Sequence, residues 1–122
     1  MLTRDRRYAA QIFEQIRQVP ESERPKYGSM AHRLPVLIRT AGLAQALAFV
    51  DSRGSAEQRK LVEHLAVVVN EPDLIGHSRT AELAEYTRVT RDVLAALVWY
   101  KRFAQSVLGV DASEEAIGDG NP

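Results

Sequence analysis

Apolar residues recur every three or four positions along most of the chain, the spacing that gathers them on one face of an α-helix. No stretch shows the strict alternation of apolar and polar residues that is typical of a half-buried strand. The pattern therefore predicts an all-α fold, a compact bundle of about four to six helices with one long C-terminal helix. The 122 residues suffice for one hydrophobic core, which we place in a single domain spanning residues 1–110.

The first half of the chain is predicted to form three helical segments. The first begins at the N-cap Thr3 and stops at Pro20, and its apolar face is formed by Tyr8, Ala9, Ile12, Phe13 and Ile16. A short helix or turn is expected around residues 26–33. A longer helix should start at Pro35 and run to about Val50, because proline fits the first turn of a helix.

This third segment is apolar around most of its circumference, so we expect it at the buried centre of the bundle. A glycine inside a helix costs roughly 1 kcal/mol relative to alanine. Close approach of a neighbouring helix would explain why Gly42 is nevertheless present there.

The second half of the chain contains two further predicted helices. Residues 51–54 end the central helix, and Ser55 caps the next one, whose apolar stripe is formed by Leu61, Val62, Leu65, Ala66 and Val69. The pattern breaks at residues 70–73, and residues 72–79 are predicted to form a loop. The last and longest helix is expected to span residues 80–108, with Gly109 as its stop.

Residues 111–122 form an acidic tail that has few large apolar groups, and we predict that it is disordered. It contains no base and the four acids Asp111, Glu114, Glu115 and Asp119. All sixteen bases and the other twelve acids lie in residues 1–110, which therefore carry a formal charge of +4.

The absence of cysteine excludes disulfides, thiolate metal ligands and a cysteine nucleophile. No stretch approaches the roughly 20 apolar residues of a membrane span. The N-terminal residues also lack the apolar core of a signal peptide. We therefore expect a soluble, cytoplasmic protein without a membrane partner.

Catalytic and metal-binding patterns are also missing from the sequence. His32, His64 and His77 lie in three different segments, and no pair has the spacing of a common zinc site. We predict that His64, beside an apolar stripe, is packed or half-exposed. No phosphate-binding glycine loop or nucleophile elbow occurs. We therefore predict a protein that is not an enzyme, with no catalytic residue, metal, cofactor or small-molecule substrate.

Positive charge is concentrated in one part of the chain, because the 27 residues from Arg24 to Val50 contain no acid. Segregated positive charge is typical of a protein that meets a polyanion. The candidate contacts to a nucleic-acid backbone are Arg24, Lys26, Arg33 and Arg39, with Tyr27 and His32 interleaved. The alternative is that distant acids, such as Glu82 or the tail, neutralise these bases in the fold.

The long final helix offers a second candidate face. Its core side is predicted to consist of Val89, Val93, Leu97, Tyr100, Ala104 and Val107. The opposite side carries the RNA or partner candidates Arg88, Arg91, Trp99 and Arg102, which could grip phosphates and stack on a base. A solvated face whose tryptophan packs on a loop or a partner is the alternative, and Glu85 and Asp92 would weaken its positive potential.

Three segments in order resemble the small helical subunit of type III-B CRISPR effector complexes, the Cmr RNA-targeting assembly. They are Lys26–Ala31 (KYGSMA), Leu34–Ile38 (LPVLI) and Gly42–Phe49 (GLAQALAF). The resemblance covers about a quarter of the sequence, and the remainder agrees in length and helical pattern. Family members often have Asn before the Gly-Leu pair, where this chain has Ala41.

The resemblance implies a non-catalytic ribonucleoprotein subunit that acts in antiviral defence. Its partners would be other Cmr-type subunits, copies of itself stacked head to tail, and the crRNA–target RNA whose channel it lines. Lys26 matches the family pattern, whereas Arg24, Arg33 and Arg39 are inferred from charge alone. Two other readings stay open: a helical protein-interaction bundle without nucleic-acid binding, and a small helical DNA-binding regulator.

Overall fold

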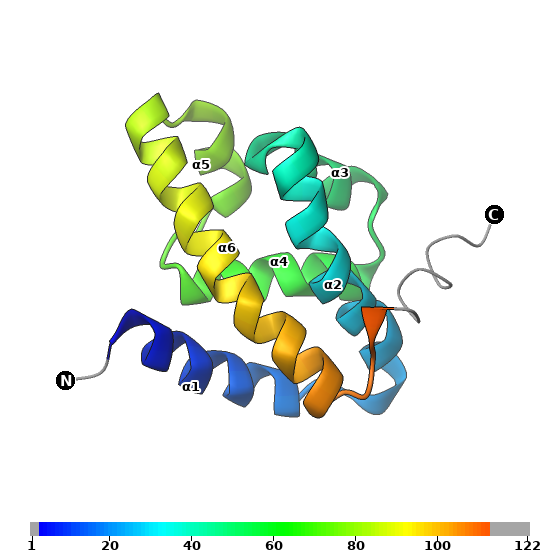
Figure 1. The fold of residues 1–122 in the computed structure, drawn as a ribbon. Coiled ribbons are helices and arrows are strands. Elements are labelled where there is room, and N and C mark those ends of the chain that lie inside the picture. The colour runs from blue at the N-terminus through cyan, green and yellow to red at the C-terminus, as the bar shows by residue number, and fades with distance from the viewer. Residues whose placement is uncertain (1–2, 113–122) are drawn as a thin grey trace.

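The computed structural model describes residues 3–112, which form six α-helices and one 3₁₀ turn (Figure 1). In chain order these are α1 (Arg4–Arg17), the 3₁₀ turn (Glu21–Glu23), α2 (Arg24–Ala41), α3 (Leu43–Arg53), α4 (Ala56–Val68), α5 (Leu74–Thr80) and α6 (Leu83–Ser106). Residues 3–112 contain no strand, so the prediction of an all-α fold with one long last helix is confirmed. Most of the predicted acidic tail, residues 113–122, lies outside the described residues.

Helix α6 is the longest helix and packs against both α2 and α1 (Figure 1). Five of the six residues predicted for its core side are buried, namely Val89, Val93, Leu97, Tyr100 and Ala104, together with Ala96. The sixth, Val107, is only partly buried and lies just after the helix ends. Helix α4 contacts α1, α2 and α6, while α3 lies against α2, α4 and α5. One continuous core therefore joins every helix of the described chain.

Helix α1 forms as its sequence predicts. The Thr3 side chain accepts a hydrogen bond from the Arg6 backbone N–H and so caps the helix. Tyr8, Ile12 and Ile16 are buried at helical spacing. Phe13 differs from them, because 43% of its surface stays exposed.

Helix α2 contradicts the prediction that a helix starts at Pro35, because it runs without a break from Arg24 to Ala41 with Pro35 inside it. A proline inside a helix removes a backbone hydrogen bond and costs about 3 kcal/mol. The buried residues on both sides of Pro35 offset this cost, among them Met30, Leu34 and Ile38. Burial of the residues that flank Pro35 therefore outweighs the tendency of proline to interrupt a helix.

The prediction that Gly42 lies inside a helix is wrong, because Gly42 lies between α2 and α3. Its φ of 91° and ψ of 160° suit glycine and are strained for other residues, so the backbone turns here from α2 to α3. The expected close neighbour is present, because a Cβ on Gly42 would lie 3.2 Å from the Tyr86 hydroxyl of α6. That hydroxyl also accepts a hydrogen bond from the Ala44 backbone N–H at the start of α3.

Helix α4 begins with the predicted cap, Ser55, in a reciprocal capping box with Gln58. The Ser55 side chain accepts from the Gln58 backbone N–H, and the Gln58 side chain accepts from the Ser55 backbone N–H. The predicted apolar stripe is buried. Helix α4 ends at Val68, and Asn70 follows its C-cap Val69 with a φ of 60°, a conformation typical of the residue after a helix C-cap.

We expect Ser55→Ala to lower the free energy of unfolding by about 1 kcal/mol, because it removes one acceptor from the first turn of α4. Urea denaturation of both proteins measures this difference. Ser52→Ala is the matched control, since Ser52 is exposed and bonds only to carbonyls of its own helix. Equal losses in the two variants would contradict a specific capping role for Ser55.

The prediction of a loop over residues 72–79 is wrong, because α5 spans Leu74–Thr80. The Asp73 carboxylate caps this short helix by accepting from the Gly76 backbone N–H at 3.1 Å. Leu74 and Ser78 are buried, and packing against α3 holds the helix in place. The predicted last helix is correspondingly shorter, since α6 begins at Leu83 and ends at Ser106.

Among residues 3–112, no helix combines the length and the apolar content that crossing a membrane requires.

Candidate nucleic-acid interface

The structure does not bring together the four bases predicted as the first RNA-binding face. Arg24 and Lys26 lie at the start of α2, where the Arg24 side chain donates to the Val19 carbonyl at 3.2 Å. The Arg33 guanidinium lies 5.4 Å from the centre of the Phe49 ring in α3. Arg39 lies in the last turn of α2 and faces α6 instead.

Tyr27 and His32 interleave with these bases in the sequence but do not share a surface with them. Tyr27 is fully buried and His32 is 5% exposed. Within residues 3–112, Arg24, Lys26 and Arg39 form no ion pair, so Glu82 does not neutralise them. Residues 113–122 of the acidic tail, the other part of that alternative, lie outside the described residues.

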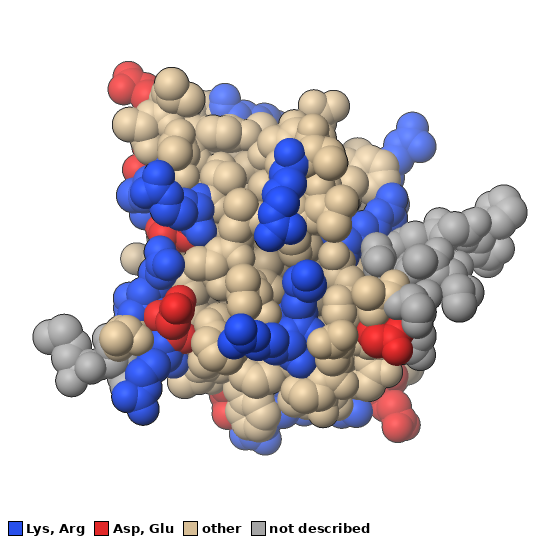
Figure 2. Space-filling view, viewed as in Figure 1, with Lys and Arg blue, Asp and Glu red and all other residues tan. Residues whose placement is uncertain are grey.

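A shallow groove of about 200 Å³ between α2 and α6 joins one residue from each predicted face. Its cations are Arg39 of α2 with Lys101 and Arg102 of α6, and its apolar wall is formed by Pro35, Leu94 and Val98. No acid lines it, and none of its three cations forms an ion pair with another described residue. Figure 2 shows Lys and Arg side chains on the face of α2 and α6, with no acidic side chain between them at its centre. We call this feature the α2–α6 groove.

An aromatic cluster adjoins the α2–α6 groove and consists of Phe13, Trp99 and Phe103. The Phe13 and Phe103 rings lie edge to face with centroids 5.5 Å apart, and the Trp99 and Phe103 centroids are 5.9 Å apart. The Arg102 guanidinium lies 4.8 Å from the centre of the Trp99 ring, within the range of a cation–π contact. This contact fixes one cation of the groove against the partly buried tryptophan.

Arg88 belongs to a different environment from Arg102, although the sequence places both on one helix face. Its guanidinium pairs with Glu71 at 3.1 Å, Glu85 at 2.7 Å and Asp92 at 3.0 Å. Hydrogen bonding to Glu85 raises the pKa of Arg88 above its usual value. Its charge is therefore balanced locally, and we leave it out of the candidate interface. Arg91 is exposed but does not line the α2–α6 groove.

The carboxylate of Glu85 makes the Arg88 network sensitive to acid. Hydrogen bonds from Arg88 and His77, and the charges of the same residues, lower the pKa of Glu85 from 4.5 to about 2. A group with a depressed folded pKa stabilises the fold above its unfolded pKa, and this contribution is lost as the pH falls toward 2. The effect should be modest because solvent screens exposed pairs.

We expect the free energy of unfolding to fall less steeply between pH 4.5 and 2 in Glu85→Gln than in the unmodified protein. Urea denaturation across this pH range measures the slope. Glu82→Gln, which changes an exposed acid immediately before α6, is the matched control. Identical slopes for Glu85→Gln and the unmodified protein would contradict the role of Glu85.

Glu71, His77 and Glu85 form a cluster that the sequence did not predict, with one potential metal-ligand atom from each within 4.8 Å of the others. Three separate segments supply these residues, so no spacing pattern could have indicated them. His77 Nε2 lies 3.0 Å from Glu85, and both carboxylates pair with Arg88. Because an arginine already supplies the positive charge there, we interpret the cluster as an ion network that ties α5 to α6.

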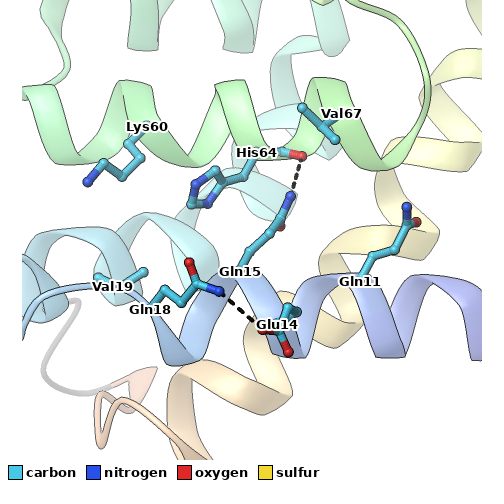
Figure 3. Close-up of a pocket in the computed structure, with 8 residues that line it drawn as sticks. All are labelled: Gln11, Glu14, Gln15, Gln18, Val19, Lys60, His64 and Val67. Atoms are coloured by element: carbon cyan, nitrogen blue, oxygen red, sulfur yellow. Dashed lines mark hydrogen bonds between the residues drawn. The ribbon is translucent and has the colours of Figure 1, made fainter.

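A pocket lined mainly by polar side chains also lies between α1 and α4, and Figure 3 shows these side chains. Gln15 of α1 donates to the His64 carbonyl of α4 at 3.1 Å and accepts from the Tyr100 hydroxyl. The Tyr27 hydroxyl and His64 Nδ1 lie 2.7 Å apart. Burial, followed by the charge of Lys60, lowers the pKa of His64, so its neutral ring accepts this hydrogen bond. These contacts join the helices, and His64 is half-buried as predicted.

Lys101 lines the α2–α6 groove but was not among the predicted site residues. A signal was available, because residues 93–110 also contain no acid. This acid-free stretch and the one from Arg24 to Val50 supply the two walls of the groove. Two acid-free helices that pack together predict a positive surface where they meet.

Comparisons with known proteins point to one family. Residues 4–107 match the family model described as CRISPR-associated protein (Cas_Cmr5). The chain is 47% identical over 112 residues to the CRISPR system Cmr subunit Cmr5 of Thermus thermophilus, a match that covers 88% of this chain and 98% of the relative. The crystal structure of a CRISPR-associated Cmr5 family protein from the same organism resembles this fold with a TM-score of 0.77 and 45% identity, and the match covers 88% of this chain and 99% of that one.

Proposed function

Because the chain belongs to the CRISPR-associated Cmr5 family, we propose that it contacts the RNA backbone as a small, non-catalytic subunit of a type III-B CRISPR (Cmr) effector complex. In that role it acts in antiviral defence beside other Cmr-type subunits. The family assignment bears out the resemblance seen in the sequence. RNA contact and head-to-tail stacking are the parts that need testing.

The observation that carries the proposed RNA contact is the α2–α6 groove. Its three cations, Arg39, Lys101 and Arg102, are exposed and lie beside apolar side chains. Arginine can hold a phosphate through two parallel hydrogen bonds, and lysine acts as a point charge. The apolar wall can cover ribose or base surface. Such a site grips backbone without reading sequence, which is the division of labour expected where guide–target pairing supplies specificity.

The contacts of the three histidines support a structural rather than a catalytic role. His32 Nε2 bonds to the Val110 carbonyl, His64 Nδ1 to the Tyr27 hydroxyl, and His77 Nε2 to the Glu85 carboxylate. Each is engaged in joining two segments of the fold. We assign no reaction to this chain, so any RNA cleavage by the assembly would come from other subunits.

Head-to-tail stacking of copies requires two non-identical surfaces, since it uses a heterologous interface. The aromatic cluster of Phe13, Trp99 and Phe103 is the candidate for one of them, because partly exposed aromatic residues beside an arginine are typical of interface hot spots. The same cluster also favours the alternative function, a protein-interaction bundle without nucleic-acid binding. The two differ in whether the isolated chain binds RNA at low salt.

We expect the isolated chain to bind single-stranded RNA weakly and with a strong dependence on salt. Three phosphate contacts predict a slope of log K against log salt of about −2, or an affinity loss of about 20-fold between 50 and 200 mM salt. Fluorescence anisotropy with a labelled oligouridine measures both quantities. Failure to bind at low salt would favour the protein-interaction bundle.

Co-purification tests the assignment to an assembly. A tagged copy expressed in its native host should elute with other Cmr-type subunits and with a crRNA, identified by mass spectrometry and by RNA sequencing. Elution of the chain alone, without RNA or other subunits, would contradict the proposed function.

A further inference from the structure

A second basic feature, separate from the α2–α6 groove, lies at the end of the bundle where α2 begins. It is a cleft of about 750 Å³, and its cations are Arg24, Lys26 and Arg53. Glu21 lies on its wall. Glu57 is close enough to Lys26 for that charge to contribute to its lowered pKa, behind a backbone hydrogen bond and one involving Ser55. The three cations outnumber these two acids, and we call this feature the basic cleft.

The chain's own C-terminal residues form part of the wall of the basic cleft. Leu108, Gly109 and Val110 line it after α6 has ended. Gly109 turns the backbone with a φ of 73°, a conformation that suits glycine. The chain therefore reaches the cleft by a defined turn and passes along its edge.

Three contacts hold Val110 in this position. Its side chain lies against Gly28, where no Cβ intervenes, its carbonyl accepts from His32 Nε2 at 2.9 Å, and its N–H donates to the Ala104 carbonyl at 2.9 Å. Because a carbonyl oxygen only accepts, His32 Nε2 carries the proton in this bond. The last described residue, Ala112, follows two positions after Val110, whose side chain lines the cleft.

The residues that follow are complementary to the cleft in charge. Residues 113–122 contain Glu114, Glu115 and Asp119 and no base. An extended chain advances about 3.3 Å per residue, so the two glutamates lie within roughly 10 Å of Ala112 along the chain. That reach spans a cleft of this size. From the cleft, its anchor at Val110 and this charge pattern, we infer that the acidic segment 113–122 binds in the basic cleft of its own chain.

The consequence is an internal ligand that competes with other anions for Arg24, Lys26 and Arg53. An RNA backbone or an acidic segment of another protein would have to displace it to reach these cations. The α2–α6 groove is lined by none of the same residues, so it would stay available. This inference does not depend on RNA binding in that groove.

Zero-length carbodiimide cross-linking tests the inference directly, because the chain has only three lysines, each in a different setting. Lys26 lies in the basic cleft, Lys60 pairs with Glu23, and Lys101 lies in the α2–α6 groove. We expect mass spectrometry of the full chain to show Lys26 joined to the acidic segment at least several-fold more often than Lys101. The Lys60–Glu23 product serves as the internal reference.

The matched variant is Glu114→Gln/Glu115→Gln/Asp119→Asn. It should lose the cross-links between Lys26 and the acidic segment and keep the cross-link between Lys60 and Glu23. An equal mixture of unlabelled and ¹⁵N-labelled chains separates binding within one chain from binding between chains. Equal yields on Lys26 and Lys101, or mixed-isotope products at the statistical ratio, would overturn the inference.

Amide NMR provides a second readout that needs no chemical reaction. Comparing the full chain with a chain that ends at Ala112, we expect shift changes at Lys26, Arg53 and Gln58 and none at Gln105. Changes confined to residues 108–112 would overturn the inference. Titration with oligouridine is a further check. If it shifts the Lys26 amide signal equally in the full chain and in the shortened chain, RNA enters the cleft without competition and the inference is overturned.

Discussion

Replacing Gly28 by alanine should destabilise the fold by about 1–3 kcal/mol, the usual cost of inserting a methyl group into a filled site. A Cβ on Gly28 would lie 2.7 Å from Val110 Cβ and 2.9 Å from Val110 Cγ2. The closest of these atoms is not the free end of a flexible side chain, so the backbone near Val110 must move. That movement would strain the His32 hydrogen bond to the Val110 carbonyl. Thermal and urea unfolding measure the loss of stability. For domains of roughly 60–100 residues, each kcal/mol lowers Tm by about 4–8 °C.

A double-mutant cycle separates this contact from a general effect of alanine in α2. Val110→Gly removes the opposing Cβ and its methyl groups and should destabilise the protein by itself, because Val110 is 6% exposed. In the double variant the new methyl group of Gly28→Ala meets no Cβ. We therefore expect a loss smaller than the sum of the single losses by 0.5 kcal/mol or more, roughly the lower bound for residues in contact. Strict additivity would contradict the account of Gly28.

Reversing the three charges of the α2–α6 groove should lower target-RNA affinity of the assembled complex by about tenfold or more at 0.15 M salt. The variant Arg39→Glu/Lys101→Glu/Arg102→Glu replaces three attractive contacts with three repulsive ones. Because all three side chains are exposed, we expect the bundle to stay folded and to assemble. Filter binding of a labelled target RNA, with circular dichroism as a check on folding, measures the effect.

The matched control applies the same change in net charge away from the groove. Arg6, Arg7 and Arg79 are exposed and lie in α1 and α5, outside the α2–α6 groove. Glutamate is tolerated in the first turn of α1 because the helix dipole favours negative charge there. We expect the control Arg6→Glu/Arg7→Glu/Arg79→Glu to keep most of the affinity. Equal losses in both triple variants would show that net charge, not the groove, governs binding.

The sequence predicts the helical class, the core face of α6 and the Ser55 cap, because these depend on local periodicity and capping chemistry. It misplaces the boundary between α2 and α3. Pro35 resembles a helix start, but burial of its neighbours keeps α2 continuous. Gly42 resembles a glycine inside a helix, and only its positive φ and the nearby Tyr86 hydroxyl reveal a junction. Such features depend on tertiary contacts that a local pattern does not contain.

The sequence predicted two separate basic faces, and the fold brings one residue of each into the same groove. Arg39 was predicted as part of the first face and Arg102 as part of the second. The packing of α2 against α6 places both side chains in the α2–α6 groove. Arg88 shares a helix face with Arg102, but carboxylates from the α4–α5 connection and α6 neutralise it. Charge along a chain therefore indicates that a positive surface exists, whereas its composition depends on which helices pack together.

Site-resolved RNA cross-linking would identify which residues of this subunit lie against the target RNA. The complete complex, assembled on a target RNA that carries 4-thiouridine, is irradiated and digested, and the linked peptides of this subunit are identified by mass spectrometry. We expect links at or beside Arg39 and in the segment from Trp99 to Arg102, and we expect both to be lost in the triple charge-reversal variant. Links absent from both segments, in a complex that retains this subunit and its RNA, would contradict the assignment of the α2–α6 groove to RNA.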